Sequence, residues 1–96
     1  MSNQSIRVGI IGLGKMGITR ARELDRHPAA LLTAGYDPRP EVFSECFPKV
    51  SIAQSASGLI HGDIDAVFVC TPNRFTPGIV IEALDAGKHV FCEKPP

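Results

Sequence analysis

Three glycines near the amino end have the spacing of a loop that can seat phosphate groups. Gly12, Gly14 and Gly17 follow an apolar run and open a predicted helix. In such a loop the first glycine permits a tight turn, the second lets the backbone approach a diphosphate, and the third lets the helix lie close to the strand. The N–H groups of the first helical turn, at the positive end of the helix dipole, then bind phosphate oxygens. We therefore predict that the loop contacts a dinucleotide through Gly12, Leu13, Gly14, Lys15, Met16 and Gly17.

An acidic residue supports this interpretation because of its position. A lone glycine pattern also fits an ordinary turn, but Asp37 closes the second predicted strand, well downstream of Gly17. A carboxylate about 20 residues after the glycines accepts hydrogen bonds from the adenosine ribose and repels a 2′-phosphate, which favours NAD over NADP. The alternative is a plain turn residue, since Asp37 and Pro38 form a good turn pair.

The neighbouring Arg39 keeps the choice of cofactor open. A guanidinium near the ribose can pair with a 2′-phosphate, which would favour NADP. The plainer alternative is a solvated loop charge. We predict NAD as the cofactor, leave NADP open, and count Arg39 among the residues that contact it.

Two further segments directly follow predicted strands. Thr71, Pro72 and Asn73 come after the fourth strand, and Glu93 and Lys94 come after the fifth. In an open parallel sheet, ligands bind beyond the carboxyl ends of the strands. These five residues should therefore lie at the same edge as the glycine loop, and we predict that they line the cofactor cleft.

Lys94 is the residue to which we assign a catalytic role. A cationic nicotinamide nearby, together with partial burial, lowers the pKa of an ammonium group from about 10.4 toward neutrality. Such a lysine can polarise a substrate oxygen or relay its proton. Composition alone favours a surface lysine in a proline-rich turn. The strand-end position, together with the family resemblance given below, favours the catalytic interpretation.

The elements that must position these residues alternate between strand and helix. The predicted strands span residues 7–11, 31–36, 50–53, 66–70 and 89–92. The predicted helices span residues 15–26, 40–47 and 55–61, and a fourth is capped by Thr76, begun by Pro77 and ended by Gly87. The first strand is an unbroken apolar run, which suits a central parallel strand covered on both faces. The alternation predicts an α/β fold: a doubly wound, Rossmann-type parallel sheet of about five strands with helices on both faces.

The composition is that of an ordinary globular protein. Of the 96 residues, 44% are hydrophobic and 21% charged, and ten basic residues balance ten acidic ones. This neutrality argues against nucleic acid or an anionic membrane surface as the main partner. No apolar run is long enough for a secretory signal or a membrane span.

The cysteines and histidines offer weaker signals. Cys46, Cys70 and Cys92 lack metal-ligand spacing. They therefore indicate no metal site, reduced thiols and a cytoplasmic protein. Because Cys70 and Cys92 close predicted strands, we expect both to be small buried hydrophobic residues. The histidines are expected to be structural or solvated. They are His27, His61 and His89.

Taken together, the motifs resemble those of one enzyme family. The segments "GIIGLGKMG", "YDP", "TPN" and "EALDAGKHVFCEKP" are similar to the amino-terminal half of the Gfo/Idh/MocA oxidoreductases, from Arg7 to Pro95. The resemblance implies NAD(P)-dependent hydride transfer at a secondary alcohol of a sugar or cyclitol. It also implies that Lys94 lies beside nicotinamide and substrate, and that Glu93 helps to fix the nicotinamide end. Many relatives carry a histidine where this chain has Thr76, so that histidine's role is in doubt here.

The resemblance also implies a larger protein. A doubly wound domain normally has six strands, and the sequence stops at Pro96, directly after the fifth. We expect residues 1–96 to be a truncated dinucleotide-binding domain, followed in the family by a larger α/β domain that builds the substrate pocket and the oligomer interface. That domain usually supplies an acid–base histidine. By itself the chain should bind cofactor weakly and turn over no substrate, because it contributes only part of a cleft.

Two other functions fit parts of the pattern. A non-catalytic regulatory module that senses NAD(P) could share the fold, although Lys94 favours the enzyme. A methyltransferase could share the glycine loop, although the "EKP" segment and the strand–helix spacing argue against it.

Overall fold

The computed structural model describes residues 6–71, 74 and 76–92. The strands are β1 (Ile6–Ile11), β2 (Ala30–Tyr36), β3 (Ser51–Ile52), β4 (Ala66–Val69) and β5 (His89–Cys92). The helices are α1 (Lys15–Arg26), α2 (Glu41–Cys46), α3 (Ala56–Ile60) and α4 (Thr76–Asp85). The predicted alternation is confirmed, and helix α4 begins at Thr76 itself, one residue before the predicted start.

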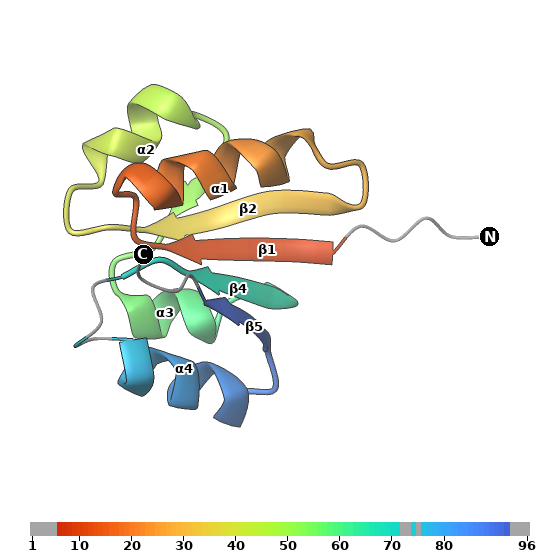
Figure 1. Ribbon diagram of the computed structural model, residues 1–96, viewed down its shortest axis with the longest axis vertical. Coiled ribbons are helices and arrows are strands. Elements are labelled where there is room, and N and C mark those ends of the chain that lie inside the picture. Colours follow the sequence, from red (N-terminus) through yellow and green to blue (C-terminus); the bar gives the residue numbers. More distant parts are fainter. Residues whose placement is uncertain (1–5, 72–73, 75, 93–96) are drawn as a thin grey trace.

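The five strands form one parallel sheet in the order β3-β2-β1-β4-β5. Helices α1 and α2 cover one face, and α3 and α4 cover the other (Figure 1). The chain builds outward from β1 in one direction through β2 and β3, and then restarts on the other side of β1 with β4. The carboxyl ends of β1 and β4 therefore mark the point where the strand order reverses, which is where ligands bind in such sheets.

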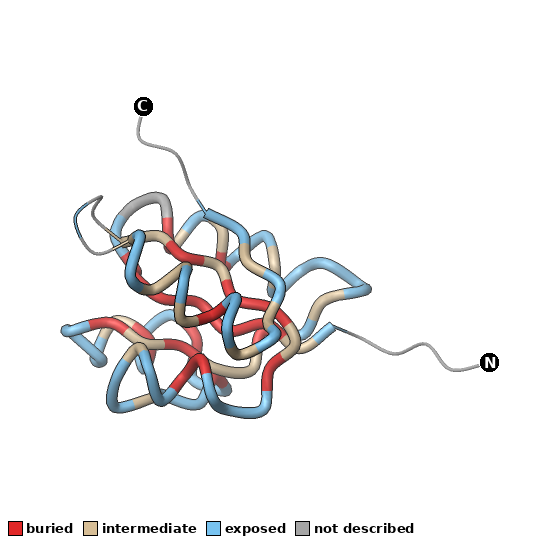
Figure 2. Tube along the Cα trace, turned by 90° about the horizontal axis from the view of Figure 1, so that it is seen from below, coloured by how far each residue is buried: buried red, intermediate tan, exposed pale blue. Residues whose placement is uncertain are grey.

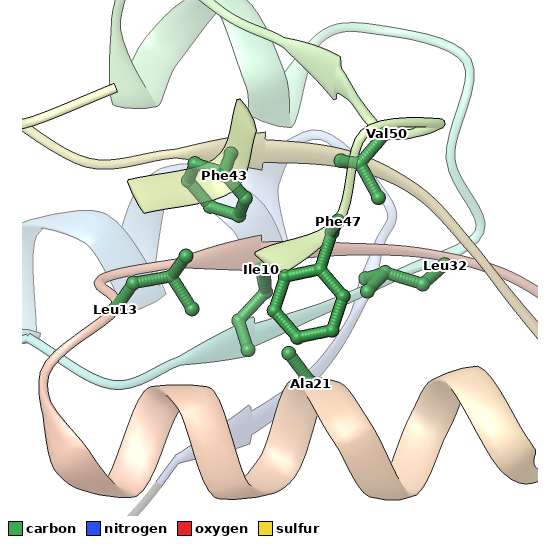
Figure 3. Close-up of a cluster of buried hydrophobic side chains, with 7 residues drawn as sticks. All are labelled: Ile10, Leu13, Ala21, Leu32, Phe43, Phe47 and Val50. Carbon is green, nitrogen blue, oxygen red and sulfur yellow. The ribbon is translucent and has the colours of Figure 1, made fainter. Parts of the chain in front are cut away.

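Each face of the sheet has its own hydrophobic core. The core under α1 and α2 contains Ile10, Leu13, Ala21, Leu32, Phe43, Phe47 and Val50 (Figure 3). The core under α3 and α4 contains Ile11, Leu59, Ile60, Ile64, Val67, Val69 and Ala83. Neighbouring residues of a strand point to opposite faces, so Ile10 of β1 lies in one core and Ile11 in the other. The buried segments run through the middle of the molecule (Figure 2), as the unbroken apolar run of β1 predicts.

One glycine fixes how α2 docks on the sheet. Phe43 of α2 is fully buried against β2 at Gly35. A Cβ on Gly35 would lie 2.2 Å from Cε1 of Phe43, far inside any tolerated contact. The ring and the missing side chain are therefore complementary, and they hold the end of β2 in place.

The end of the sheet opposite the glycine loop is held by an ion-pair cluster. Arg7 donates from Nε and Nη2 to the two carboxylate oxygens of Asp65 at 3.2 and 3.0 Å, and its backbone N–H donates to Asp65 Oδ2 at 2.9 Å. It also pairs with Asp63. These hydrogen bonds from Arg7 lower the pKa of Asp65 to about 2. The cluster ties β1 to the turn that precedes β4.

The expectation for the cysteines holds only in part. Cys70 is partly buried, whereas Cys92 and Cys46 are exposed. The expectation that Cys92 is buried is wrong because β5 is the last strand of the described sheet and pairs with β4 along one edge. Phe91 beside it is also exposed, although its ring stacks on Phe68 at 5.3 Å between centroids.

Candidate functional site

A cavity of about 940 Å³ opens where β1, β2 and β4 end. Its walls come from the glycine loop, the turn after β2, the end of β4 and the first turn of α4. The predicted site residues that line it are Gly12, Leu13, Gly14, Gly17, Asp37, Arg39 and Thr71. Pro72, Asn73, Glu93 and Lys94 lie outside the described residues, as do the side chains of Lys15 and Met16.

The three glycines of the loop differ in whether the fold or the cavity accounts for the missing side chain. Gly12 has φ +93°, and a Cβ there would lie 2.6 Å from the carbonyl oxygen of Cys70. A Cβ on Gly17 would lie 2.1 Å from the carbonyl oxygen of Gly12, so α1 can start against the end of β1 only with glycine at this position. Among the described residues, the chain neighbours of Gly14 aside, no heavy atom lies within 4 Å of the Cβ position there. The fold itself therefore requires Gly12 and Gly17, whereas the space over Gly14 is open to the cavity.

The start of α1 is suited to an anion. Gly14 is the N-cap, no side chain of the described residues caps this end, and the first turn contains no acidic residue. The first N–H groups of a helix have no partner within the helix, and the helix dipole adds positive potential at this end. The open space over Gly14 and these donors together form a cradle with the chemistry of a phosphate site.

Asp37 is the buried polar residue of the cavity wall, with 7% of its surface exposed. Its Oδ2 accepts a hydrogen bond from the backbone N–H of Leu13 at 2.6 Å, and its Oδ1 accepts one from the backbone N–H of Arg39 at 2.8 Å. The second contact is the turn interaction that the sequence allowed as an alternative. The first contact reaches across to the glycine loop, and no sequence pattern predicts it.

The side chain of Arg39 lies at the cavity rim. It is 70% exposed, and its Nε is 4.0 Å from Asp37 Oδ1. An ion pair this open to water contributes little to stability. The guanidinium is therefore available to a ligand at little cost to the fold.

The end of β4 is fastened to the start of α4 by two threonines. The hydroxyls of Thr71 and Thr76 are 3.0 Å apart, and Thr76 Oγ1 donates to the carbonyl oxygen of Thr71 at 3.3 Å. Thr71 lines the cavity, so this contact fixes one wall of it. The hydroxyl of Thr76 is the group that makes both contacts at the start of α4.

Sequence reasoning missed several wall residues. They are Ile11, Tyr36, Pro38, Ala56, Cys70, Gly78 and Ile79. Tyr36 ends β2, Cys70 directly follows β4, and Gly78 and Ile79 lie in the first turns of α4. The signal was present, because any residue that ends a parallel strand or starts the next helix lies at this edge of the sheet.

The histidines lie elsewhere. His27 ends α1 and accepts a hydrogen bond at Nδ1 from the backbone N–H of Ala29, at 3.0 Å. His61 pairs through Nε2 with Glu82 at 3.0 Å, and His89 begins β5. Within the described ranges, no group of three His, Cys, Asp or Glu side chains could hold a metal ion. In that same part of the chain, no helix has the length and apolarity needed to cross a membrane.

Comparison with known proteins decides the family. Residues 6–96 match the model of GFO_IDH_MocA, described as "Oxidoreductase family, NAD-binding Rossmann fold". The chain belongs to this family. The resemblance found in the sequence motifs is thereby confirmed, and so is the assignment as an NAD-binding fold.

Individual relatives of this Gfo/Idh/MocA chain agree. It is 36% identical over 94 residues to myo-inositol 2-dehydrogenase of Thermotoga maritima, a match that covers 94% of this chain and 28% of that protein. Apo scyllo-inositol dehydrogenase of Lactobacillus casei has a TM-score of 0.87 at 32% identity, over 99% of this chain and 30% of that one. The same enzyme with bound NAD(H) and scyllo-inositol has a TM-score of 0.83 at 34% identity, over 96% and 28%. The chain thus spans less than a third of the length of these relatives.

Proposed function

We propose that this chain is the dinucleotide-binding domain of an NAD-dependent oxidoreductase that acts on a secondary alcohol of a cyclitol or sugar. The observation that carries the proposal is the open space over Gly14, between two glycines that the fold requires and at the uncapped start of α1. Family membership supports NAD as the cofactor. The names of the relatives support the substrate class, since several are inositol dehydrogenases.

The described residues have distinct tasks in this proposal. The N–H groups of the glycine loop and of the first turn of α1 bind the diphosphate. Asp37 accepts hydrogen bonds from the ribose hydroxyls, and its buried charge disfavours a 2′-phosphate. Thr71 holds the wall next to the nicotinamide half. Bound NAD supplies the hydride acceptor.

The residues beyond the described part complete the chemistry. Pro72 and Asn73 line the nicotinamide side, and Glu93 helps to fix that end of the cofactor. Lys94, two residues after the end of β5 in the sequence, polarises the substrate oxygen as an ammonium group or relays its proton. We propose in addition that the complete protein has a second domain carrying the substrate pocket, forms a homo-oligomer and works in the cytoplasm.

The full-length protein tests the proposal directly. NAD and NADP are titrated by calorimetry, and cyclitols and sugars are then screened for reduction of the bound cofactor. We expect NAD to bind at least about tenfold more tightly than NADP, a difference of about 1.4 kcal/mol. Failure to bind either cofactor would refute the proposal. Binding without turnover of any cyclitol or sugar would favour the regulatory alternative instead.

The catalytic assignment has its own matched pair of variants. Lys94→Ala should lower kcat by about 10²–10⁴ with little change in the Kd of NAD, which is the range for loss of a general acid–base group. Lys49→Ala, a change at an exposed lysine outside the cavity, should leave both unchanged. Equal kcat values for the two variants would remove Lys94 from the mechanism.

A further inference from the structure

The carboxylate of Asp37 makes two hydrogen bonds within the chain itself. Its two oxygens hold two backbone N–H groups, that of Leu13 in the glycine loop and that of Arg39 in the following turn. The Leu13 contact, at 2.6 Å, joins residues 24 positions apart and is buried. It is a charge-assisted hydrogen bond, which is about twice as strong as a neutral one.

The segment that Asp37 holds would otherwise be weakly constrained. Leu13 stands between Gly12, in the left-handed region, and Gly14, whose surroundings are open. Glycine loses more conformational freedom on ordering than any other residue. The loop keeps its shape through the N–H of Gly12, which donates to Tyr36 at 2.8 Å, through the Leu13 side chain, which is buried, and through Asp37.

The carboxylate of Asp37 can accept further hydrogen bonds besides those from the two backbone N–H groups. An ionised carboxylate offers about four acceptor positions, and the two backbone N–H groups use two of them. The remaining positions suffice for the two hydroxyls of a ribose. Holding the loop and binding the sugar are therefore compatible within one side chain.

We propose that Asp37 is a positioning residue for the phosphate seat, by which we mean the glycine loop and the first turn of α1, residues 12–17. Its carboxylate accepts a hydrogen bond from the N–H of Leu13 and so holds the loop in the conformation that binds a diphosphate. This role adds to the ribose contact, and its effect on binding rests on the proposed function. It follows that replacing Asp37 to admit the 2′-phosphate of NADP also loosens the loop that binds the diphosphate common to both cofactors. Such a variant therefore binds the diphosphate of either cofactor less well, which offsets part of what NADP gains when the negative charge is removed.

The first test needs no ligand. Amide hydrogen exchange is measured by NMR on the cofactor-free protein for wild type and Asp37→Asn. The asparagine has the same shape but only one acceptor oxygen, so it cannot serve both backbone donors. The control Glu41→Gln removes a charge from an exposed carboxylate four residues along the chain. We expect Leu13 to exchange at least about tenfold faster in Asp37→Asn and at the wild-type rate in the control.

The second test separates the loop from the ribose. ADP and 2′,3′-dideoxy-ADP are titrated into the full-length wild type and the same variants. If Asp37 acted only through the ribose hydroxyls, Asp37→Asn would weaken ADP and leave the dideoxy nucleotide unaffected. We expect the dideoxy nucleotide to be weakened as well, by at least about fivefold, because the diphosphate seat itself is altered.

The outcomes are distinguishable. An unchanged exchange rate at Leu13 in Asp37→Asn, or an unweakened dideoxy nucleotide, would overturn the positioning role. If wild type binds neither ADP nor NAD, the proposed function fails, and the exchange test alone decides the role of Asp37. Exchange at the core residues Ile10 and Val67 reports whether the variant is folded. If the variant is unfolded, the exchange rate of the Leu13 amide in the wild-type protein decides. Exchange about a hundredfold or more slower than that of an unstructured amide supports the hydrogen bond to Asp37, and exchange at the unstructured rate refutes it.

Discussion

Substituting Gly14 by alanine should separate ligand binding from folding. Gly14 has φ −72° and ψ −169°, an extended conformation that alanine adopts without strain. In the part of the chain that the structure describes, no heavy atom beyond the chain neighbours lies within 4 Å of the added Cβ. Replacing a glycine N-cap by alanine costs about 0.5–1.5 kcal/mol, while the stiffer unfolded chain returns about 0.4–1 kcal/mol. We therefore expect a stability change within about 1 kcal/mol.

The affinity for NAD should change more than the stability does in the Gly14→Ala variant. The methyl group would occupy the space in which a diphosphate approaches the start of α1, and overfilled contacts typically cost about 1–3 kcal/mol. NAD affinity should fall at least about tenfold, while the melting temperature moves by no more than about 4–8 °C. Calorimetric titration with NAD and thermal unfolding monitored by circular dichroism measure the two effects on one protein sample.

Gly17→Ala is the matched comparison. Its Cβ would lie 2.1 Å from the carbonyl oxygen of Gly12, so α1 would have to move by about 1 Å to relieve the contact. Stability should drop by about 1–3 kcal/mol or more, even without cofactor. The reasoning is refuted if Gly14→Ala binds NAD like wild type, or if Gly14→Ala is destabilised as much as Gly17→Ala.

Three further predictions concern the scaffold. Gly35→Ala should destabilise the protein by about 1–3 kcal/mol, because its Cβ meets the Phe43 ring. In a Phe43→Leu background this loss of stability should largely vanish. Additive effects of the two substitutions in chemical denaturation would contradict the contact. Asp65 has a lowered pKa of about 2, so its ion pair with Arg7 adds stability above about pH 4 that is lost as the pH falls toward 2. Denaturation curves for Asp65→Asn should show a shallower loss of stability over that interval than wild type, and parallel curves would exclude this contribution. Ile81→Lys on the outer face of α4, where the side chain is 60% exposed, should change stability by about 0.5 kcal/mol or less, whereas Ala83→Lys, at a fully buried position, should unfold the protein.

Much of the fold could be predicted because it depends on local signals. The apolar run of β1, the glycine after it and the proline after α1 each act within a few residues, and the parallel order follows from strand–helix alternation. The exposure of Cys92 could not be predicted in the same way. A strand-closing cysteine is buried only if another element covers that edge, and the local sequence of β5 does not specify its neighbours.

The candidate site was predictable to a similar degree. The positions of Gly12, Gly17 and Asp37 followed from spacing, because backbone geometry at strand ends places them at one edge. The hydrogen bond from Leu13 to Asp37 was not predictable, since it joins two turns 24 residues apart and depends on their exact approach. The threonine pair at the end of β4 is a similar case, because either hydroxyl could equally have faced solvent.

The two charged residues after β2 contribute to the site in different ways. Asp37 is buried, and each of its oxygens accepts a hydrogen bond from a backbone N–H, so we expect any change there to alter the loop as well as the proposed ribose contact. Arg39 is 70% exposed, and its guanidinium touches the carboxylate only at 4.0 Å, so its side chain is nearly independent of the fold. Selection for one cofactor over the other can therefore act on position 39 at little cost in stability, whereas position 37 is constrained by the shape of the phosphate seat. In the proposed site, Asp37 thus serves both the folding of the loop and the choice of cofactor, whereas Arg39, two residues later, can serve only the second.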